Sequence, residues 1–297
     1  MTALAAQKSA VLIAGPTASG KSQRALEIAA TRDGVVVNAD SMQVYRELTV
    51  LSARPSPTDE AIAPHRLYGH VGAATRYSVG AWLADVAPVV SEARRQGRLV
   101  VFVGGTGLYF KALTEGLATV PPIPAAIGER VAAEVAGLDS EAMHARLAAL
   151  DPEDAAEVRP SDRSRILRAL EVFATTGRPL ASWKRMAGGP PVVDPDTAER
   201  LVLAVEMPEI HRRIAMRADA MVRGGGIEEA RALVGLGLDP AMPAMKAIGV
   251  REFAAHLAGD MSLEEALTAI KTETRRYAKR QMTWIRTQMA DWTRLAS

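Results

Sequence analysis

The residues from Gly15 to Ser22 have the composition and spacing of a loop that binds phosphate groups. They fit the pattern G-x-x-x-x-G-K-[S/T], and the segment consists of Gly15, Pro16, Thr17, Ala18, Ser19, Gly20, Lys21 and Ser22. In such a loop backbone N–H groups converge on an anion, and the next helix adds partial positive charge. We expect Lys21 to neutralise a phosphate group and Ser22 to face Mg²⁺. The pattern predicts a diphosphate or triphosphate site; a glycine turn that matches by chance is the alternative.

Two further polar residues follow apolar runs that predict buried strands. Asp40 comes shortly after Val35–Val37, and Thr106 lies among the glycines of Gly104–Gly107. A carboxylate beside a phosphate loop can hold Mg²⁺ or accept a proton from a nucleophile. A hydroxyl among glycines can orient a ligand that approaches the backbone closely. The alternatives are a helix N-cap for Asp40 and a tight strand-to-helix turn for Thr106.

Basic residues gather on three predicted helices. Arg165 and Arg168 are three residues apart and share a helix face, and Arg213 and Arg217 are four apart on another helix. The segment from 271 to 286 holds six Lys or Arg residues and one acid, with Tyr277 and Trp284 interleaved. Such a face is typical of contact with a phosphate backbone near stacking surfaces, and a solvated helix face is the alternative. The spacing of Arg213 and Arg217 allows one of them to point its guanidinium group at a diphosphate.

The elements that must position these residues alternate between strand and helix. Apolar runs predict strands over residues 10–14, 35–37, 99–103 and 201–205. Helices are predicted over 23–30, 77–95 (with Ser78 as N-cap and a stop at Gly97), 209–223, from 227 and over 262–295. This alternation predicts an α/β fold with a P-loop NTPase-like parallel sheet flanked by helices. The active loops should then lie side by side at the carboxyl ends of the strands.

A change of pattern divides the chain. A proline cluster at 120–124 predicts a hinge, and residues from about 125 to 186 are rich in alanine without strand signals. We therefore predict a P-loop core over residues 1–119 and 199–297, interrupted by an all-helical insertion over 120–198.

The composition excludes several classes of protein. The chain has 297 residues, a formal net charge of +2 and no cysteine, so no disulfide, thiolate metal site or thiol catalysis is expected. Its five histidines lack metal-ligand spacing, and neither a signal region nor an apolar run of about 18 residues is found. We expect a soluble, cytoplasmic protein that does not bind membranes.

Together the motifs resemble one family, the tRNA dimethylallyltransferases (tRNA isopentenyltransferases) of bacterial type. The matching stretches are residues 15–22, 40–45, 104–109, 165–172, 247–252 and 279–284, which are spread over nearly the whole chain. A phosphate loop alone is common, but this ordered set is specific.

The resemblance implies transfer of a dimethylallyl group from dimethylallyl diphosphate to N6 of adenosine 37 in the anticodon loop of tRNAs. The phosphate loop would hold the leaving diphosphate with Mg²⁺, and Thr17 would face the prenyl donor. Asp40 falls where the family has its proposed general base, Thr106 near the substrate adenine, and Arg217 where an arginine grips the diphosphate beside Lys21. We expect a monomer that binds the anticodon stem-loop of tRNA.

The tRNA-binding residues that the resemblance implies lie in all parts of the chain. They are Asp40, Ser41, Met42, Gln43, Thr106, Arg130, Ser164, Arg165, Ile166, Leu167, Arg168, Lys246, Gly249, Arg251, Lys279, Arg280, Gln281, Thr283, Trp284 and Arg286.

The sequence departs from the family in two places. The family's Gly-Thr-Ala-Lys-Pro is Leu-Ser-Ala-Arg-Pro at residues 51–55, and its Pro-His-His-Leu is Pro-His-Arg-Leu at 64–67. Two other functions remain open: a P-loop kinase of small molecules, and a nucleotide-gated RNA-binding module without catalysis. A small-molecule kinase does not explain the basic helices. A module that only binds RNA does not need a base at the strand end, where Asp40 lies.

Overall fold

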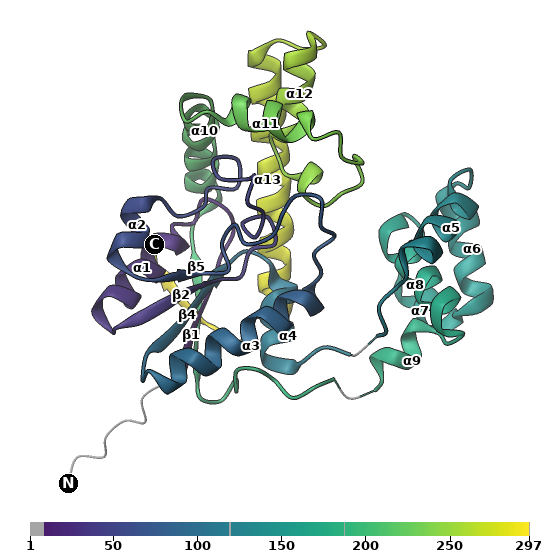
Figure 1. Cartoon of the computed structure of the whole chain (residues 1–297), viewed down its shortest axis with the longest axis horizontal. Helices are drawn as coiled ribbons and strands as arrows, with labels where there is room; N and C mark the ends of the chain where they lie inside the picture. Colours follow the sequence, from purple (N-terminus) through teal and green to yellow (C-terminus); the bar gives the residue numbers. More distant parts are fainter. Residues whose placement is uncertain (1–8, 119, 187, 297) are drawn as a thin grey trace. The chain divides into compact units, whose positions relative to one another are not determined.

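The fold is seen in a computed structural model that describes residues 9–118, 120–186 and 188–296 (Figure 1). The chain divides into two compact units: Met1–Thr114 with Pro191–Ser297, and Glu115–Pro190. The helical insertion was predicted over residues 120–198, whereas the second compact unit covers residues 115–190. Two predictions fall partly outside the described residues. Residue 119 is the last of the predicted first core segment, and residues 1–8 belong to the region expected to lack a signal sequence.

The first unit is built on six parallel strands in the order β3-β2-β4-β1-β5-β6. Their bounds are β1 Ala10–Ala14, β2 Gly34–Asn38, β3 His65–Arg66, β4 Leu99–Gly104, β5 Ala198–Ala204 and β6 Thr293–Ala296. The central strands β1, β2 and β4 are buried throughout, which explains why they read as continuous apolar runs. The predicted α/β fold is confirmed, and β2, β4 and β1 lie next to one another.

Helices cover both faces of this sheet. Successive side chains of a strand point to opposite faces, so Leu12 and Phe102 pack on one side and Val11 and Val101 on the other. Helix α1 (Lys21–Thr31) packs against the second side. Helices α3 (Val79–Arg95) and α4 (Gly107–Glu115) pack against the first. As predicted, the hydroxyl of Ser78 caps α3 by accepting a hydrogen bond from the N–H of Ala81 (3.1 Å).

A second apolar core lies beyond one end of the sheet, where further helices gather (Figure 1). These are α10 (Met207–Arg223), α11 (Gly226–Gly235), α12 (Val250–Ala258) and α13 (Leu263–Gln288), with the short 3-10 helix η1 (Ala244–Lys246). The capped helix α2 (Pro57–Ile62) follows the segment that departs from the family pattern. Short elements such as α2, β3 and α4 had no clear sequence signal.

The predicted last helix, residues 262–295, was wrong at its end. Helix α13 stops at Gln288, and the chain then forms β6, which pairs with β5. Trp292, just before β6, is buried in the core on one face of the sheet, with its ring edge-on to Phe110 at 5.5 Å between centroids. The burial of Trp292 and the pairing of β6 with the edge of the sheet therefore favour a strand here, although the local sequence pattern predicts a helix.

The regular elements among the described residues of the second unit are all helices. Its helices are α5 (Ala125–Val135), α6 (Ser140–Leu150), α7 (Pro152–Glu157), α8 (Arg163–Thr176) and α9 (Leu180–Lys184). They enclose a separate core that includes Val131, Met143, Leu147 and Ile166.

Candidate functional site

The predicted phosphate loop lies between β1 and α1. Lys21 opens α1, and its Nζ donates a hydrogen bond to the carbonyl of Pro16 at 3.2 Å. Gly20 precedes it with φ of 89°, a left-handed conformation that favours glycine. Thr17 and Ser19 are buried within the loop, whereas Ser22 is exposed on the first helical turn. The side chain of Lys21 thus bonds back to the backbone of the loop, and the hydroxyl of Ser22 lies at the surface.

Asp40 follows β2 and is held by its neighbour Asn38. The side chain of Asn38 accepts a hydrogen bond from the N–H of Asp40 (2.8 Å) and donates one to its carbonyl (2.9 Å). One carboxylate oxygen of Asp40 accepts from the N–H of Met42 at 2.9 Å. No helix begins here within the described residues, so the helix N-cap alternative is wrong and the carboxylate instead stabilises a turn. Because this contact fixes the carboxylate rather than occupying both oxygens, a catalytic role stays compatible with it.

Thr106 follows β4 and joins its loop to that of Asp40. Its Oγ1 accepts a hydrogen bond from the N–H of Ser41 (3.0 Å) and donates one to the hydroxyl of Ser41 (3.3 Å). Parallel neighbouring strands bring these two loops together, as the sequence predicted.

Helix α10 supplies two arginines to the phosphate loop. Arg217 Nη1 donates to the hydroxyl of Thr17 at 2.7 Å, and Arg213 Nη1 donates to the carbonyl of Ser19 at 3.1 Å. Arg213 is also held by Glu209, whose pKa falls to about 2 because Arg212 and Arg213 donate hydrogen bonds to it. The four-residue spacing places both guanidinium groups on the same helix face.

Helix α13 contributes a role that sequence reasoning missed. The amide of Gln281 accepts a hydrogen bond from the N–H of Thr17 (2.8 Å) and donates one to the carbonyl of Gly105 (3.0 Å). A Cβ at residue 105 would overlap the amide nitrogen of Gln281, so a larger residue there would displace this amide. Gln281 therefore clamps the phosphate loop to the loop after β4.

Burial and charge shift the pKa values of the groups gathered here. Burial lowers the pKa of Lys21 to about 8, and nearby Arg217 lowers it while Asp40 raises it. Burial also lowers the pKa of Arg217, which Asp40 opposes. The hydroxyl of Tyr277 has a raised pKa, first through burial and then through the charge of Asp40. Asp40, Lys21, Arg217 and Tyr277 thus lie within electrostatic reach of one another.

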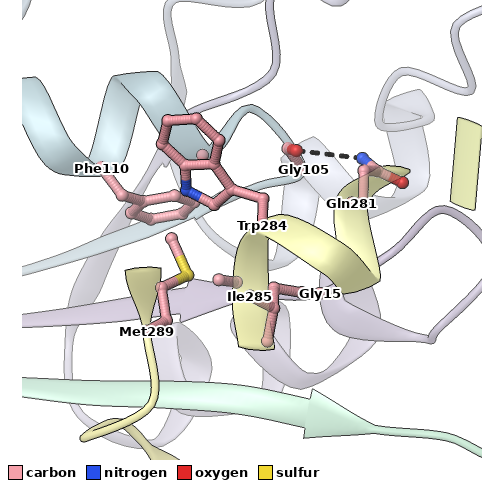
Figure 2. A pocket seen from close by; sticks show the side chains of 9 residues that line it. Gly15, Gly105, Phe110, Gln281, Trp284, Ile285 and Met289 are labelled. Atoms are coloured by element: carbon pink, nitrogen blue, oxygen red, sulfur yellow. Dashed lines mark hydrogen bonds between the residues drawn. The ribbon is translucent and has the colours of Figure 1, made fainter. Parts of the chain in front are cut away.

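A small pocket lies behind the phosphate loop and is lined mainly by apolar groups (Figure 2). Its lining residues are Ala14, Gly15, Gly105, Gly107, Phe110, Gln281, Trp284, Ile285 and Met289. Trp284 packs against Gly107, where a Cβ would overlap the indole, and among the described residues its Nε1 has no hydrogen-bond partner. The predicted stacking residue Trp284 thus faces this pocket.

The predicted tRNA-binding residues fall into three groups by solvent exposure. Exposed side chains are those of Arg130, Ser164, Arg165, Arg168, Lys246, Arg251, Lys279, Arg280, Thr283 and Arg286, and half-buried ones are those of Asp40, Ser41, Met42, Gln43, Thr106, Leu167 and Trp284. Ile166, Gly249 and Gln281 lie in the interior. Ile166 packs in the helical core, Gly249 directly precedes α12, and Gln281 forms the clamp, so the RNA contact of these three stays a prediction.

Comparison with known proteins identifies the family. A model of the IPP transferase family matches residues 43–288, and one of isopentenyl transferases matches residues 8–70. The chain belongs to the IPP transferase family. The tRNA dimethylallyltransferase of Bradyrhizobium sp. strain ORS 278 is 51% identical over 292 residues, which cover 98% of this chain and 94% of that protein. That of Nitrobacter hamburgensis is 51% identical over 286 residues, or 96% and 90%.

A solved IPP transferase agrees in fold as well. The full-length tRNA isopentenylpyrophosphate transferase of Bacillus halodurans is 32% identical, with a TM-score of 0.69 over 97% of this chain and 90% of that one. The resemblance inferred from the motifs, including its bacterial type, is confirmed.

Two features are absent from the part of the chain that the structure describes. Among these residues no group of three or more His, Cys, Asp or Glu side chains could hold a metal ion. Mg²⁺ commonly binds through one or two protein oxygens together with substrate phosphates, a set that Ser22 and a bound diphosphate would supply. No helix within residues 9–118, 120–186 and 188–296 is long and apolar enough to cross a membrane.

The two hydrogen bonds of Gln281 predict that its substitution lowers the stability of the fold, and more so when both bonds are lost than when one is. Gln281→Leu would leave the N–H of Thr17 and the carbonyl of Gly105 unpaired, whereas Gln281→Glu would keep an acceptor for Thr17 and lose the donor to Gly105. Each unpaired buried group costs about 1–3 kcal/mol, so both variants should lower the free energy of unfolding, measured by urea denaturation. The matched control is Thr283→Ala on the exposed side of the same helix; a loss equal to that of Gln281→Leu there would contradict the clamp.

The pKa of Lys21 predicts how anion binding depends on pH. With a pKa near 8 in the free protein, the ammonium group is charged below pH 8 and loses its proton above it. The affinity for inorganic diphosphate, measured by calorimetry, should therefore fall about tenfold between pH 7 and 9.5. Lys21→Arg keeps its charge over this range and should remove that fall; an unchanged profile in this variant would assign the titration to another group.

Proposed function

We propose that this chain transfers a dimethylallyl group from dimethylallyl diphosphate to N6 of adenosine 37 in the anticodon loop of tRNAs. The observation that carries the proposal is the gathering of Asp40, Lys21 and Arg217 at the phosphate loop of an IPP transferase. Its relatives named tRNA dimethylallyltransferase support the same reaction. We propose a monomer, as the resemblance to the family implies, and a tRNA substrate supports a cytoplasmic enzyme.

The diphosphate side of the reaction needs positive charge. The C1–O bond of the donor breaks and diphosphate leaves, so negative charge develops on the leaving oxygen as the allylic carbon becomes positive. Lys21, Arg217 and the backbone N–H groups of the phosphate loop are positioned to stabilise that charge. Mg²⁺ held by Ser22 and phosphate oxygens would add further positive charge to the leaving group. Half-buried cations interact more strongly with an anion than exposed ones do, because less water screens them.

The acceptor side needs a base and a positioned adenine. A new bond forms between N6 and C1, and the proton released from N6 passes to the carboxylate of Asp40. The hydroxyl of Thr106, which bonds to Ser41 beside Asp40, would orient the adenine. Since a stacked base cannot reach such a site, the adenine must leave its stack. The amine and the carbon must then be held in line for the transfer.

The exposed basic residues would hold the tRNA backbone. In the first unit these are Lys246, Arg251, Lys279, Arg280 and Arg286, and in the helical unit Arg130, Arg165 and Arg168. On α13, Glu273 pairs with Arg276, and Lys271 pairs with Asp219 of α10. The remaining cations of this helix outnumber its acids, and this unbalanced charge favours a polyanion partner.

The transfer itself is tested with labelled donor. The protein is incubated with dimethylallyl diphosphate labelled in the prenyl group, unmodified tRNA and Mg²⁺, and label is measured in RNA and mapped to a nucleotide. Label at adenosine 37 is expected, with loss of transfer when EDTA removes Mg²⁺. Parallel arms contain ATP and a panel of small-molecule metabolites. Phosphorylation of a metabolite without label in RNA would favour the kinase and overturn the proposal.

The variant Asp40→Asn tests the role of Asp40 as a base separately from its role in stabilising the turn. Asparagine keeps an oxygen that accepts the hydrogen bond from Met42, but it cannot take up the proton from N6. We expect kcat to fall about 10²–10⁴-fold, with the affinity for tRNA little changed. Asp260→Asn, an exposed carboxyl after α12, is the control and should retain activity. A large loss of tRNA affinity in Asp40→Asn would instead give Asp40 a binding role.

The helical unit has its own test in the salt dependence of tRNA binding. Arg165→Ala and Arg168→Ala each remove an exposed cation from one face of α8, and each should weaken binding. The slope of log affinity against log salt concentration should decrease in magnitude by about one for each phosphate group that is no longer neutralised. Arg185→Ala, an exposed arginine of the same unit paired with Glu153, serves as control. Unchanged slopes in the α8 variants would remove these residues from the RNA surface.

A further inference from the structure

A carboxylate outside the catalytic loops holds the backbone of residues 49–51, which lead into the segment that departs from the family pattern at residues 51–55. Glu229 lies in the first turn of α11 and faces residues 49–51. One of its oxygens accepts hydrogen bonds from the N–H groups of Thr49 (2.9 Å) and Val50 (2.7 Å), and the other accepts one from Leu51 (2.9 Å). Hydrogen bonds to an ionised acceptor are about twice as strong as neutral ones, so the backbone here is firmly fixed.

The same segment contacts the arginine of the phosphate loop. The carbonyl of Leu51 accepts a hydrogen bond from Nη2 of Arg217 at 3.0 Å, while Nη1 of Arg217 donates to the hydroxyl of Thr17 at 2.7 Å. The guanidinium is therefore held from two sides, by the phosphate loop and by Leu51. Among the described residues its Nε is buried without a hydrogen-bond partner, so these contacts determine its orientation.

Packing of Leu51 adds a second anchor. Its side chain is buried and lies over the starts of α11 and α12, where a Cβ on Gly226 or Gly249 would come within 3.2 or 2.8 Å of its Cδ2. The amide of Gln43 also donates to the carbonyls of Ser52 and Ala53, at 2.9 Å each. Ala53 has a φ of 54°, an uncommon conformation for alanine that requires such support.

From these contacts we propose that Glu229 is a positioning residue of the diphosphate site. Its carboxylate fixes the backbone of residues 49–51, and the carbonyl of Leu51 in turn holds the guanidinium of Arg217 against Thr17. Glu229 bonds to neither the phosphate loop nor Arg217, so its effect is transmitted through the segment. The inference rests on the proposed function, in which Arg217 binds the leaving diphosphate.

The first test compares two neighbouring glutamates. Glu229→Ala should raise the KM for dimethylallyl diphosphate about 10- to 100-fold, because Arg217 loses its fixed orientation. The affinity for tRNA should stay within about twofold, since the segment acts on the donor site. Glu228→Ala is the matched control: Glu228 is exposed in the same first turn of α11 and shares its effect on the helix N-terminus. Equal effects of the two variants would overturn the proposal.

An isosteric variant guards against simple loss of folding. Glu229→Gln keeps the volume and one acceptor oxygen but loses the bond to Leu51, so the KM for the donor should rise less than in Glu229→Ala. Thermal unfolding followed by circular dichroism shows whether each variant is folded. If only the glutamine variant folds, an unchanged KM in it would overturn the proposal.

A double-mutant cycle with Arg217 shows whether Glu229 acts through that arginine. If it does, Glu229→Ala added to Arg217→Ala should change the KM for the donor by less than about twofold beyond Arg217→Ala alone. Multiplication of the two single effects would overturn the inference. If Arg217→Ala alone leaves this KM unchanged, the proposed role of Arg217 fails. If Arg217→Ala raises it and Glu229→Ala does not, the role of Glu229 alone fails.

Discussion

The phosphate loop keeps its shape because one side-chain amide, that of Gln281, bonds to it and to the loop after β4 at the same time. Without this clamp the N–H of Thr17 and the carbonyl of Gly105 would lose these hydrogen-bond partners. The clamp comes from α13, a helix distant in sequence from both loops. It also places Trp284, one turn further along α13, against the glycines of the second loop. A preformed loop of this kind loses little entropy when it binds an anion.

The cations beside the clamped loops have an electrostatic cost. Lys21 and Arg217 are both half-buried, and this loss of water lowers the pKa of each. Two desolvated cations in one site are costly, and the charge of Asp40 offsets part of that cost. A bound diphosphate would offset far more. The same arrangement therefore favours an anionic leaving group and keeps a carboxylate close to it, which are the two requirements of the proposed transfer.

The sequence predicted the elements more reliably than the contacts. The strands of the sheet and the cap at Ser78 were found because continuous apolar runs and capping residues have local signals. The end of α13 was not found, since the pairing of β6 and the burial of Trp292 depend on partners far away in the chain. Residues such as Ile166 and Gly249 matched a family motif, but a motif does not tell which of its members face inward.

The sequence by itself determined the family, the fold class and the residues of the phosphate loop, because these depend on the order and spacing of residue types along the chain. Only the tertiary structure decided what holds Arg217: the hydroxyl of Thr17 on one side and the carbonyl of Leu51, fixed by Glu229, on the other. Nothing local marks Glu229 as different from Glu228. The difference arises from the direction each side chain takes from α11, and that direction matters only once the helix is packed against residues 49–51.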